Sequence, residues 1–188
     1  KVSLWRGGSE DVMQRVITES RGGRASVDIV ETAGPNIEAV NREKLLVPFD
    51  TPAVSGLMPE AYAKDRPWIV SRLSVFTIAY NTNVVKKPDA PKSYAELSDP
   101  KWKGKLGVEA DDSNWLMTMS QTLGGDKLPR DIATKNGVSV RKGHSLLGNL
   151  VASGEVPVAL DAYYDEVTSL KKAGAPVEMV LAAPVVAM

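Results

Sequence analysis

Short apolar runs rich in β-branched residues alternate along this chain with longer segments of helical periodicity. Strand-like runs lie at 2–5, 27–32, 105–109, 155–160 and 177–181, and a longer extended run spans 66–82. Helices are expected between them at about 9–20, 35–43, 113–123 and 144–153, and in a stretch that ends at Gly174. This alternation predicts an α/β fold, because each helix then has a neighbouring sheet on which to bury its apolar face.

The composition changes after the extended run. Residues 84–107 hold three prolines and six lysines, and Ser93 with Glu96 forms the pattern of a capping box. We therefore expect a first domain at 1–80, a second at 81–181, and a last segment at 182–188. Within the lysine-rich part, Trp102 is expected to pack inward while its neighbouring lysines stay in water.

Charge and composition exclude several classes of function. Lysine plus arginine equals aspartate plus glutamate at 23 each, so no overall field favours nucleic acid. No window approaches the apolar length of a membrane span, and the first residues, KVSLWRGG, lack the pattern of a signal peptide. With one histidine, no cysteine and no GxSxG, P-loop or HExxH motif, the common hydrolase and nucleotide-dependent classes lack their parts, and we do not expect an enzyme.

The stretch DAYYDE at 161–166 places two tyrosines side by side between carboxylates. Two interpretations remain open from the residues alone. Tyr163 with Val167 and Leu170 forms the spacing of a buried helical stripe. Alternatively, the two phenols are oxygen ligands for a hard cation, which requires a strand-to-helix turn, because neighbouring side chains diverge by about 100° on a helix and about 180° on a strand.

Several segments together resemble a known family. YNTN at 80–83, DPKWKGK at 99–105, RGGSEDVMQRV at 6–16, DIVETAGPNIEAV at 28–40 and ASGEVPVALDAYY at 152–164 are similar to bacterial extracellular solute-binding proteins of ABC importers, in particular the ferric-iron-binding type. The resemblance implies a type 2 periplasmic-binding-protein fold, with two α/β lobes joined by crossing strands and a ligand cleft that closes by hinge motion. By that resemblance, residues 70–81 form the outward crossing strand and residues 182–188 begin the return crossing. It also implies a periplasmic or extracytoplasmic protein that is not inserted in the membrane and whose partners are the importer's membrane subunits.

The resemblance further implies a cargo site. Tyr163 and Tyr164 match the metal-binding tyrosines, and the implied cargo is Fe(III) with a synergistic anion, without a resident cofactor. The positions that match the anion cradle and the facing lobe are Asp112, Ser113, Asn114, His144, Asp161, Gly8, Ser9 and Gly34.

Two of these positions depart from the family pattern. Asp112 and Asp161 are acids where the family often has neutral donors, and a carboxylate repels an anion. Either one of these acids replaces the anion as a ligand, or the cargo is not anion-assisted Fe(III). Asp112 and Ser113 also suit the N-cap of a helix, Ser9 suits another, and His144 could serve a surface or capping role.

The first lobe is expected to be incomplete. The family's usual strand and helix before the equivalent of Lys1 and the helical return after the equivalent of Met188 are missing from this sequence. A half-domain leaves sheet edges uncovered, so we expect a partner chain, a swapped homodimer or a longer product. The alternative functions are capture of a small organic or phosphorylated solute, and a truncated paralogue that acts as an interaction module.

Overall fold

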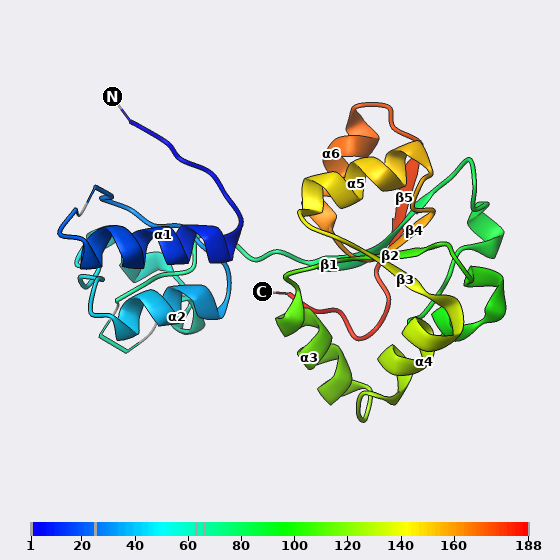
Figure 1. Cartoon of the computed structure of the whole chain (residues 1–188), viewed down its shortest axis with the longest axis horizontal. Helices are drawn as coiled ribbons and strands as arrows, with labels where there is room; N and C mark the ends of the chain where they lie inside the picture. The colour runs from blue at the N-terminus through cyan, green and yellow to red at the C-terminus, as the bar shows by residue number, and fades with distance from the viewer. Residues whose placement is uncertain (1, 25, 63, 66, 188) are drawn as a thin grey trace. The chain divides into compact units, whose positions relative to one another are not determined.

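The computed structural model describes residues 2–24, 26–62, 64–65 and 67–187, and the chain forms two compact units. The first unit ends at Leu73 and the second begins at Ser74 (Figure 1). The sequence placed this division near residue 80. It lies earlier because strand β1 (Phe76–Asn81), which the sequence assigned to the first lobe's outward crossing, pairs with two strands of the second unit.

The second unit is built on a five-stranded mixed sheet. Besides β1 it contains β2 (Leu106–Glu109), β3 (Val138–Arg141), β4 (Val158–Tyr163) and β5 (Val177–Val180), in the order β3-β2-β4-β1-β5. Strand β2 runs parallel to β3 and β4, whereas β1 runs antiparallel to β4 and β5. The parallel strands therefore end at a common edge, and the α/β class expected from the sequence is confirmed.

Four helices cover this sheet. They are α3 (Ser113–Thr122), α4 (Lys127–Asn136), α5 (His144–Ser153) and α6 (Tyr164–Lys172). Helices α5 and α6 lie on one face, and α3 and α4 lie on the other (Figure 1). The apolar core under α5 and α6 includes Leu147, Val151, Val156, Ala159 and Val167, all at most 3% exposed. The sequence analysis did not identify α4 or β3.

Three short 3-10 helices replace regular structure between β1 and β2: η3 (Lys87–Asp89), η4 (Ala95–Ser98) and η5 (Pro100–Trp102). The expected capping pattern is present in a modified form. The Glu96 amide donates to Ser93 Oγ at 3.4 Å, but the Glu96 carboxylate accepts from the amide of Lys92 rather than that of Ser93.

The first unit contains α1 (Ser9–Arg21) and α2 (Pro35–Arg42), which pack together, and the short helices η1 (Pro52–Gly56) and η2 (Pro59–Ala61). The strands expected at 2–5 and 27–32 do not form. A β-branched run favours an extended backbone, but a strand also needs a hydrogen-bonding neighbour. Among the described residues of this unit, the only β-pairing is an isolated bridge between Tyr62 and Ile69.

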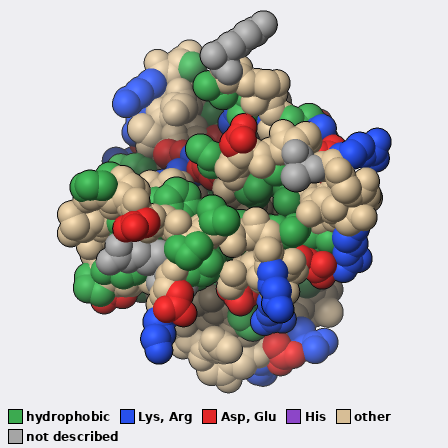
Figure 2. Space-filling view, turned by 90° about the vertical axis from the view of Figure 1, so that its left-hand side faces the viewer, with side chains coloured by type: hydrophobic (Ala, Val, Ile, Leu, Met, Phe, Trp, Pro, Cys, Tyr) green, Lys and Arg blue, Asp and Glu red, His purple; other side chains and the backbone are tan. Residues whose placement is uncertain are grey.

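The first unit buries little of its apolar surface. Val40 and Val54 are at most 1% exposed, but α1 has no buried residue. Figure 2 shows a face on which hydrophobic side chains gather among scattered acids and bases. The most exposed large apolar residues of the unit are Val2, Leu4, Ile29, Val47, Met58 and Leu73, each more than half exposed. Exposure of this extent is typical of a surface that another polypeptide covers.

The last described residues stay with the second unit. The amide of Phe76 donates to the carbonyl of Val186 at 2.9 Å, and an antiparallel bridge joins Val75 to Ala187. The segment expected to begin the return crossing thus runs beside the start of β1. No helix in the described residues has the length and apolarity needed to cross a membrane.

Candidate functional site

The candidate site lies at the carboxyl edge of the three parallel strands. Strand β2 ends at Glu109, β3 is followed by Gly143 and His144, and β4 ends at Tyr163. The carboxyl ends of parallel strands are where open α/β sheets place their ligands, because the connecting loops leave a crevice there. Asp112, His144, Asp161 and the tyrosines, which are far apart in the sequence, therefore meet at one edge of the second unit.

The two tyrosines lie at the strand-to-helix junction that the ligand interpretation required. Tyr163 is the last residue of β4 and Tyr164 is the first of α6. The Tyr163 ring stacks on the His144 imidazole, with centroids 3.6 Å apart, and meets Phe76 edge-on at 5.1 Å. The Tyr164 side chain is more open, since the residue is 44% exposed.

The positions of Tyr163 and Val167 also bear on the alternative interpretation, in which Tyr163, Val167 and Leu170 form one buried helical stripe. Val167 is 1% exposed and packs in the core of the second unit, as the helical stripe predicted. Tyr163 is only partly buried, precedes the helix and packs on aromatic rings, so it does not continue that stripe.

Three carboxylates, those of Glu109, Asp112 and Asp161, lie close to one another near the His144 imidazole. Asp161 is fully buried, and both of its oxygens accept from the amide of Glu109, at 2.9 and 3.2 Å. The Glu109 carboxylate accepts from the amides of Gly143 at 2.7 Å and Asp111 at 2.5 Å. Asp161 therefore anchors the end of β2, whereas Asp112 faces the imidazole of His144.

The pair of Asp112 and His144 replaces a simple helix cap. Asp112 occupies the N-cap position of α3, as the sequence indicated, but its side chain makes no capping hydrogen bond. Its two oxygens instead lie 3.3 Å from His144 Nε2. Ser113 is exposed and Asn114 is half-buried at the same helix start, so the residues expected from the sequence do lie together at this edge.

Burial controls the protonation of the deepest acid. Burial, together with the charges of Asp112 and Glu109 nearby, raises the pKa of Asp161 well above its ordinary value. Like charges that share a site disfavour the ionised form in this way. The carboxylate group thus carries less negative charge than three free acids would.

A cavity of about 750 Å³ opens beside these acids, within the second unit. It lies between the sheet and helices α3 and α4, and most of its lining is apolar, including Leu116, Met119, Ile132, Val138 and Val140. Trp115 lines it and is 5% exposed. Glu109, Asp112 and Asp161 form its polar end.

Glu109 is the residue that the sequence analysis missed. A single glutamate at the end of a short strand carries no motif. The available signal was its position: Glu109 ends one parallel strand and Asp161 lies near the end of the next, and such ends are adjacent in an α/β sheet.

The candidates in the first unit lie on a turn of their own. Gly8, rather than Ser9, is the N-cap of α1, because Ser9 already has helical geometry. The Ser9 hydroxyl oxygen instead accepts from the amide of Ala33 at 3.2 Å, and this contact joins the start of α1 to the turn before α2. Gly34 is the N-cap of α2 with φ of 54°, a left-handed conformation that favours glycine. Their place in a site shared with the tyrosines stays a prediction.

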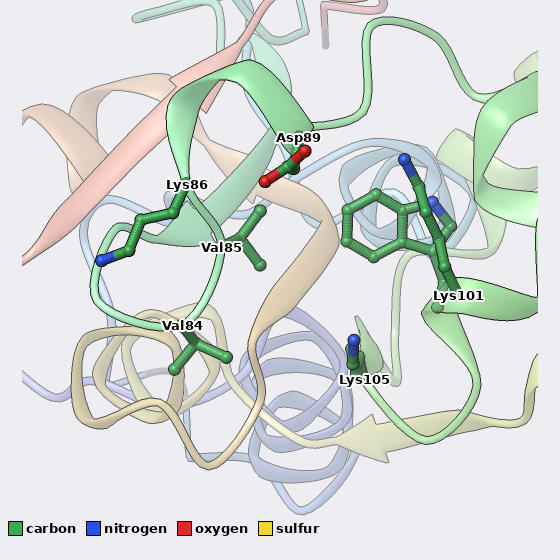
Figure 3. A pocket seen from close by; sticks show the side chains of 7 residues that line it. Val84, Val85, Lys86, Asp89, Lys101 and Lys105 are labelled. Carbon is green, nitrogen blue, oxygen red and sulfur yellow. The ribbon is translucent and has the colours of Figure 1, made fainter.

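The lysine-rich segment forms a separate, smaller cavity of about 240 Å³ (Figure 3). Trp102 is 2% exposed, and the ammonium group of Lys101 lies 4.8 Å from the centre of its ring. Figure 3 shows Lys101 and Lys105 near this cavity, with Asp89 opposite. The indole is thus a packed anchor, as expected.

Relatives of the chain are solute-binding proteins. The sequence is 26% identical to an Fe(3+)-binding periplasmic protein of Serratia marcescens over 170 residues, which are 87% of this chain and 49% of that protein. It is 31% identical to a putative 2-aminoethylphosphonate-binding periplasmic protein of Salmonella typhi over 161 residues, 81% of this chain and 45% of that protein. Both names agree with the extracytoplasmic location expected from the sequence.

The fold leads to the same group of proteins. The structure of iron-bound HitA from Pseudomonas aeruginosa matches with a TM-score of 0.75 and 24% identity, over 96% of this chain and 60% of that one. The ferric binding protein from Campylobacter jejuni matches with a TM-score of 0.75 and 17% identity, over 100% and 65%. This chain spans about half the length of the curated relatives it matches.

The match to the family covers residues 1–186, almost the whole sequence. Together with the mixed sheet and the polar groups at its carboxyl edge, this match shows that the chain belongs to the bacterial extracellular solute-binding proteins.

Proposed function

We propose that this chain forms part of an extracytoplasmic binding protein that captures Fe(III) and delivers it to an ABC importer without chemical change to the cargo. The observation that carries the proposal is the position of Tyr163 and Tyr164 at a strand-to-helix junction, beside an imidazole and a group of carboxylates. The Serratia marcescens relative and the Pseudomonas aeruginosa structure, both named for iron, support it.

The chemistry of the edge suits a hard cation. Fe(III) prefers anionic oxygen ligands. A phenol becomes such a ligand when the metal displaces its hydroxyl proton, which in water dissociates only at about pH 10. Two phenolates would neutralise two of the three charges of Fe(III). The carboxylate of Asp112 lies 3.3 Å from His144 Nε2 and adds negative charge at the same edge.

Asp112 takes the role that a bound anion has in the family pattern. An anion placed at the start of α3 would meet a carboxylate whose side chain is 9% exposed. A buried carboxylate in that position repels an anion and attracts a cation. We therefore propose that Fe(III) binds without a synergistic carbonate or phosphate.

The rest of the site belongs to the proposed two-lobed protein. Gly8, Ser9 and Gly34, at two helix starts of the first unit, are proposed as further contacts for the cargo. Backbone amides at helix starts point out of the helix and can donate hydrogen bonds to oxygen atoms, such as those of water molecules bound to the metal. The exposed apolar surface of the first unit is proposed to be covered by a second copy of the chain or by further polypeptide.

A second candidate cargo is an organic solute with an ammonium group, such as an aminoalkyl phosphonate. The specific observation is the same acidic edge, because Asp112 and Glu109 can pair with an ammonium group while the Tyr163 and His144 rings pack against its carbon chain. The Salmonella typhi relative, named for 2-aminoethylphosphonate, supports this candidate.

The visible absorption spectrum with Fe(III) distinguishes the two candidate cargoes. Adding Fe(III) to the purified chain is expected to produce a visible phenolate-to-iron charge-transfer band, which Tyr163→Phe and Tyr164→Phe each weaken. Tyr80→Phe serves as the matched control, because Tyr80 is a core residue of β1 and 2% exposed. A colourless protein in excess Fe(III), combined with thermal stabilisation by 2-aminoethylphosphonate, would replace the iron proposal with the second candidate.

A further inference from the structure

We propose that Glu109, Asp112 and His144 form a cation site of their own, which takes one divalent transition-metal ion such as Zn²⁺, Mn²⁺ or Co²⁺. This site does not use the tyrosine pair, although it shares Asp112 with the iron site proposed above, and its existence does not depend on Fe(III) being the cargo. The proposal assigns a binding role to Glu109, which no sequence motif indicated.

The fold brings three potential ligand atoms close together. One carboxylate oxygen from Glu109, one from Asp112 and one imidazole nitrogen of His144 all lie within 4.8 Å of one another. Metal–ligand bonds of about 2.0–2.2 Å place such atoms roughly 3–3.5 Å apart, so small side-chain rotations close the set around an ion. His144 Nε2 already lies 3.3 Å from both oxygens of Asp112.

Two of the three side chains carry unsatisfied atoms. Asp112 is 91% buried at its side chain, and its Oδ2 makes no hydrogen bond in the described part of the protein, although it lies 3.3 Å from His144 Nε2. The Nδ1 atom of His144 is likewise buried and without a hydrogen-bond partner there. A buried polar atom without a partner costs about 1–3 kcal/mol, and a cation bound to Asp112 Oδ2 removes that cost for the carboxylate.

The third ligand is held in place by the backbone. Glu109 receives hydrogen bonds from the amides of Gly143 and Asp111, one on each carboxylate oxygen. Each oxygen has two lone pairs, so both keep one for a metal ion. Asp161 holds the amide of Glu109 from below, and such outer contacts orient the ligands of metal sites.

The donor set selects the class of metal. Two carboxylates and one imidazole suit Zn²⁺, Mn²⁺, Co²⁺ and Fe²⁺, whereas thiolate-preferring ions find no cysteine in this sequence. The charge also fits, because two carboxylates balance a divalent ion. With three protein ligands, water or a solute completes the coordination.

The single histidine makes a direct test possible on the unaltered chain. In ¹⁵N-labelled protein, one imidazole is present, so its NMR signals belong to His144. Stoichiometric Zn²⁺ is expected to shift these signals and to fix one tautomer. Unchanged imidazole signals at saturating Zn²⁺ would overturn the proposal, and this result does not depend on whether any variant folds.

Co²⁺ titration then tests two of the three ligands. The visible spectrum is expected to report one Co²⁺ per chain, with affinity reduced at least about tenfold in Asp112→Asn and His144→Gln. Glu155→Gln is the matched control, because Glu155 is an exposed acid of the same unit with 63% of its side chain accessible. Equal affinity in the two site variants and in this control would show surface binding and would overturn the proposal.

The tyrosine variants separate this site from the iron proposal. Tyr163→Phe keeps the ring that stacks on His144 but removes the phenol, so Co²⁺ affinity is expected to stay within a factor of about two in this variant and in Tyr164→Phe. Loss of Co²⁺ binding in either variant would mean that only one shared site exists and would overturn the assignment of a separate one. Failure of the iron proposal has another signature, which is the absence of the charge-transfer band in the unaltered chain.

Discussion

Asn81 joins the family's signature turn to the body of the second unit, and its removal is expected to destabilise that unit. The residue is 2% exposed at the end of β1. Its Nδ2 group donates to the carbonyls of Val151 and Ala152, at 2.8 and 2.9 Å, near the end of α5. Its Oδ1 accepts from the amides of Asn83 and Val84, at 2.8 and 3.2 Å. One side chain thus satisfies both a helix end and a turn.

The magnitude follows from which groups lose their partners. In Asn81→Ala the two amides of the turn lie near the surface and can bind water, and the Val151 carbonyl also accepts from Gly154. The remaining loss is the Ala152 carbonyl together with the cavity left by the amide. With about 1–3 kcal/mol for each buried group without a partner, we expect a decrease of about 2–4 kcal/mol in the free energy of unfolding.

Urea denaturation followed by circular dichroism measures this decrease. The matched control is Asn83→Ala in the same turn, where the side chain is exposed and the expected change is within about 0.5 kcal/mol. Asn81→Asp keeps an acceptor for the turn but directs a second carboxylate oxygen at the two helix carbonyls, so it is expected to be at least as destabilised at neutral pH. If Asn81→Ala and Asn83→Ala unfold at the same urea concentration, the anchoring role is refuted.

Three further predictions concern the core of the second unit and the exposed surface of the first. Burial raises the pKa of Tyr94 to about 12, whereas the phenol of the unfolded chain ionises at about pH 10. The free energy of unfolding is therefore unaffected by this group below pH 10 and falls by up to about 3 kcal/mol as the pH rises towards 12. Alkaline unfolding curves of Tyr94→Phe should lack this fall. In Gly107→Ala the new methyl group would lie 2.6 Å from Val156 Cγ1 and 3.2 Å from Leu147 Cδ1, which predicts a loss of about 1–3 kcal/mol in thermal or urea unfolding, and an unchanged midpoint would refute the tight fit. The exposed apolar surface of the first unit predicts that the isolated chain self-associates, which light scattering measures. A chain that stays monomeric at high micromolar concentration would contradict the proposal that a second copy covers this surface.

The second unit could be predicted further from the sequence than the first. Strand and helix patterns at 105–109, 144–153 and 177–181 coincide closely with β2, α5 and β5, because each apolar run there finds a partner in the same unit. In the first unit, the runs at 2–5 and 27–32 have the same local pattern but no neighbouring strand, and they stay unpaired. Local propensity thus predicts an extended backbone, whereas pairing depends on what lies beside it.

The candidate site shows the same limit. The tyrosine junction could be predicted because a strand pattern ends where a helix pattern begins, and both signals lie in one short stretch. The contact of Asp112 with His144 could not, since 32 residues separate them and the strand between them, β3, was not identified. Glu109 was missed for the same reason, because its role depends on the order of strands in the sheet.

Iron-edge anomalous diffraction from crystals grown with Fe(III) tests the central claim most directly. The account predicts one strong peak within about 2 Å of the phenolic oxygens of Tyr163 and Tyr164, at the carboxyl edge of β4. A peak bonded to carboxylates alone, or the absence of any peak at these two tyrosines, would contradict it.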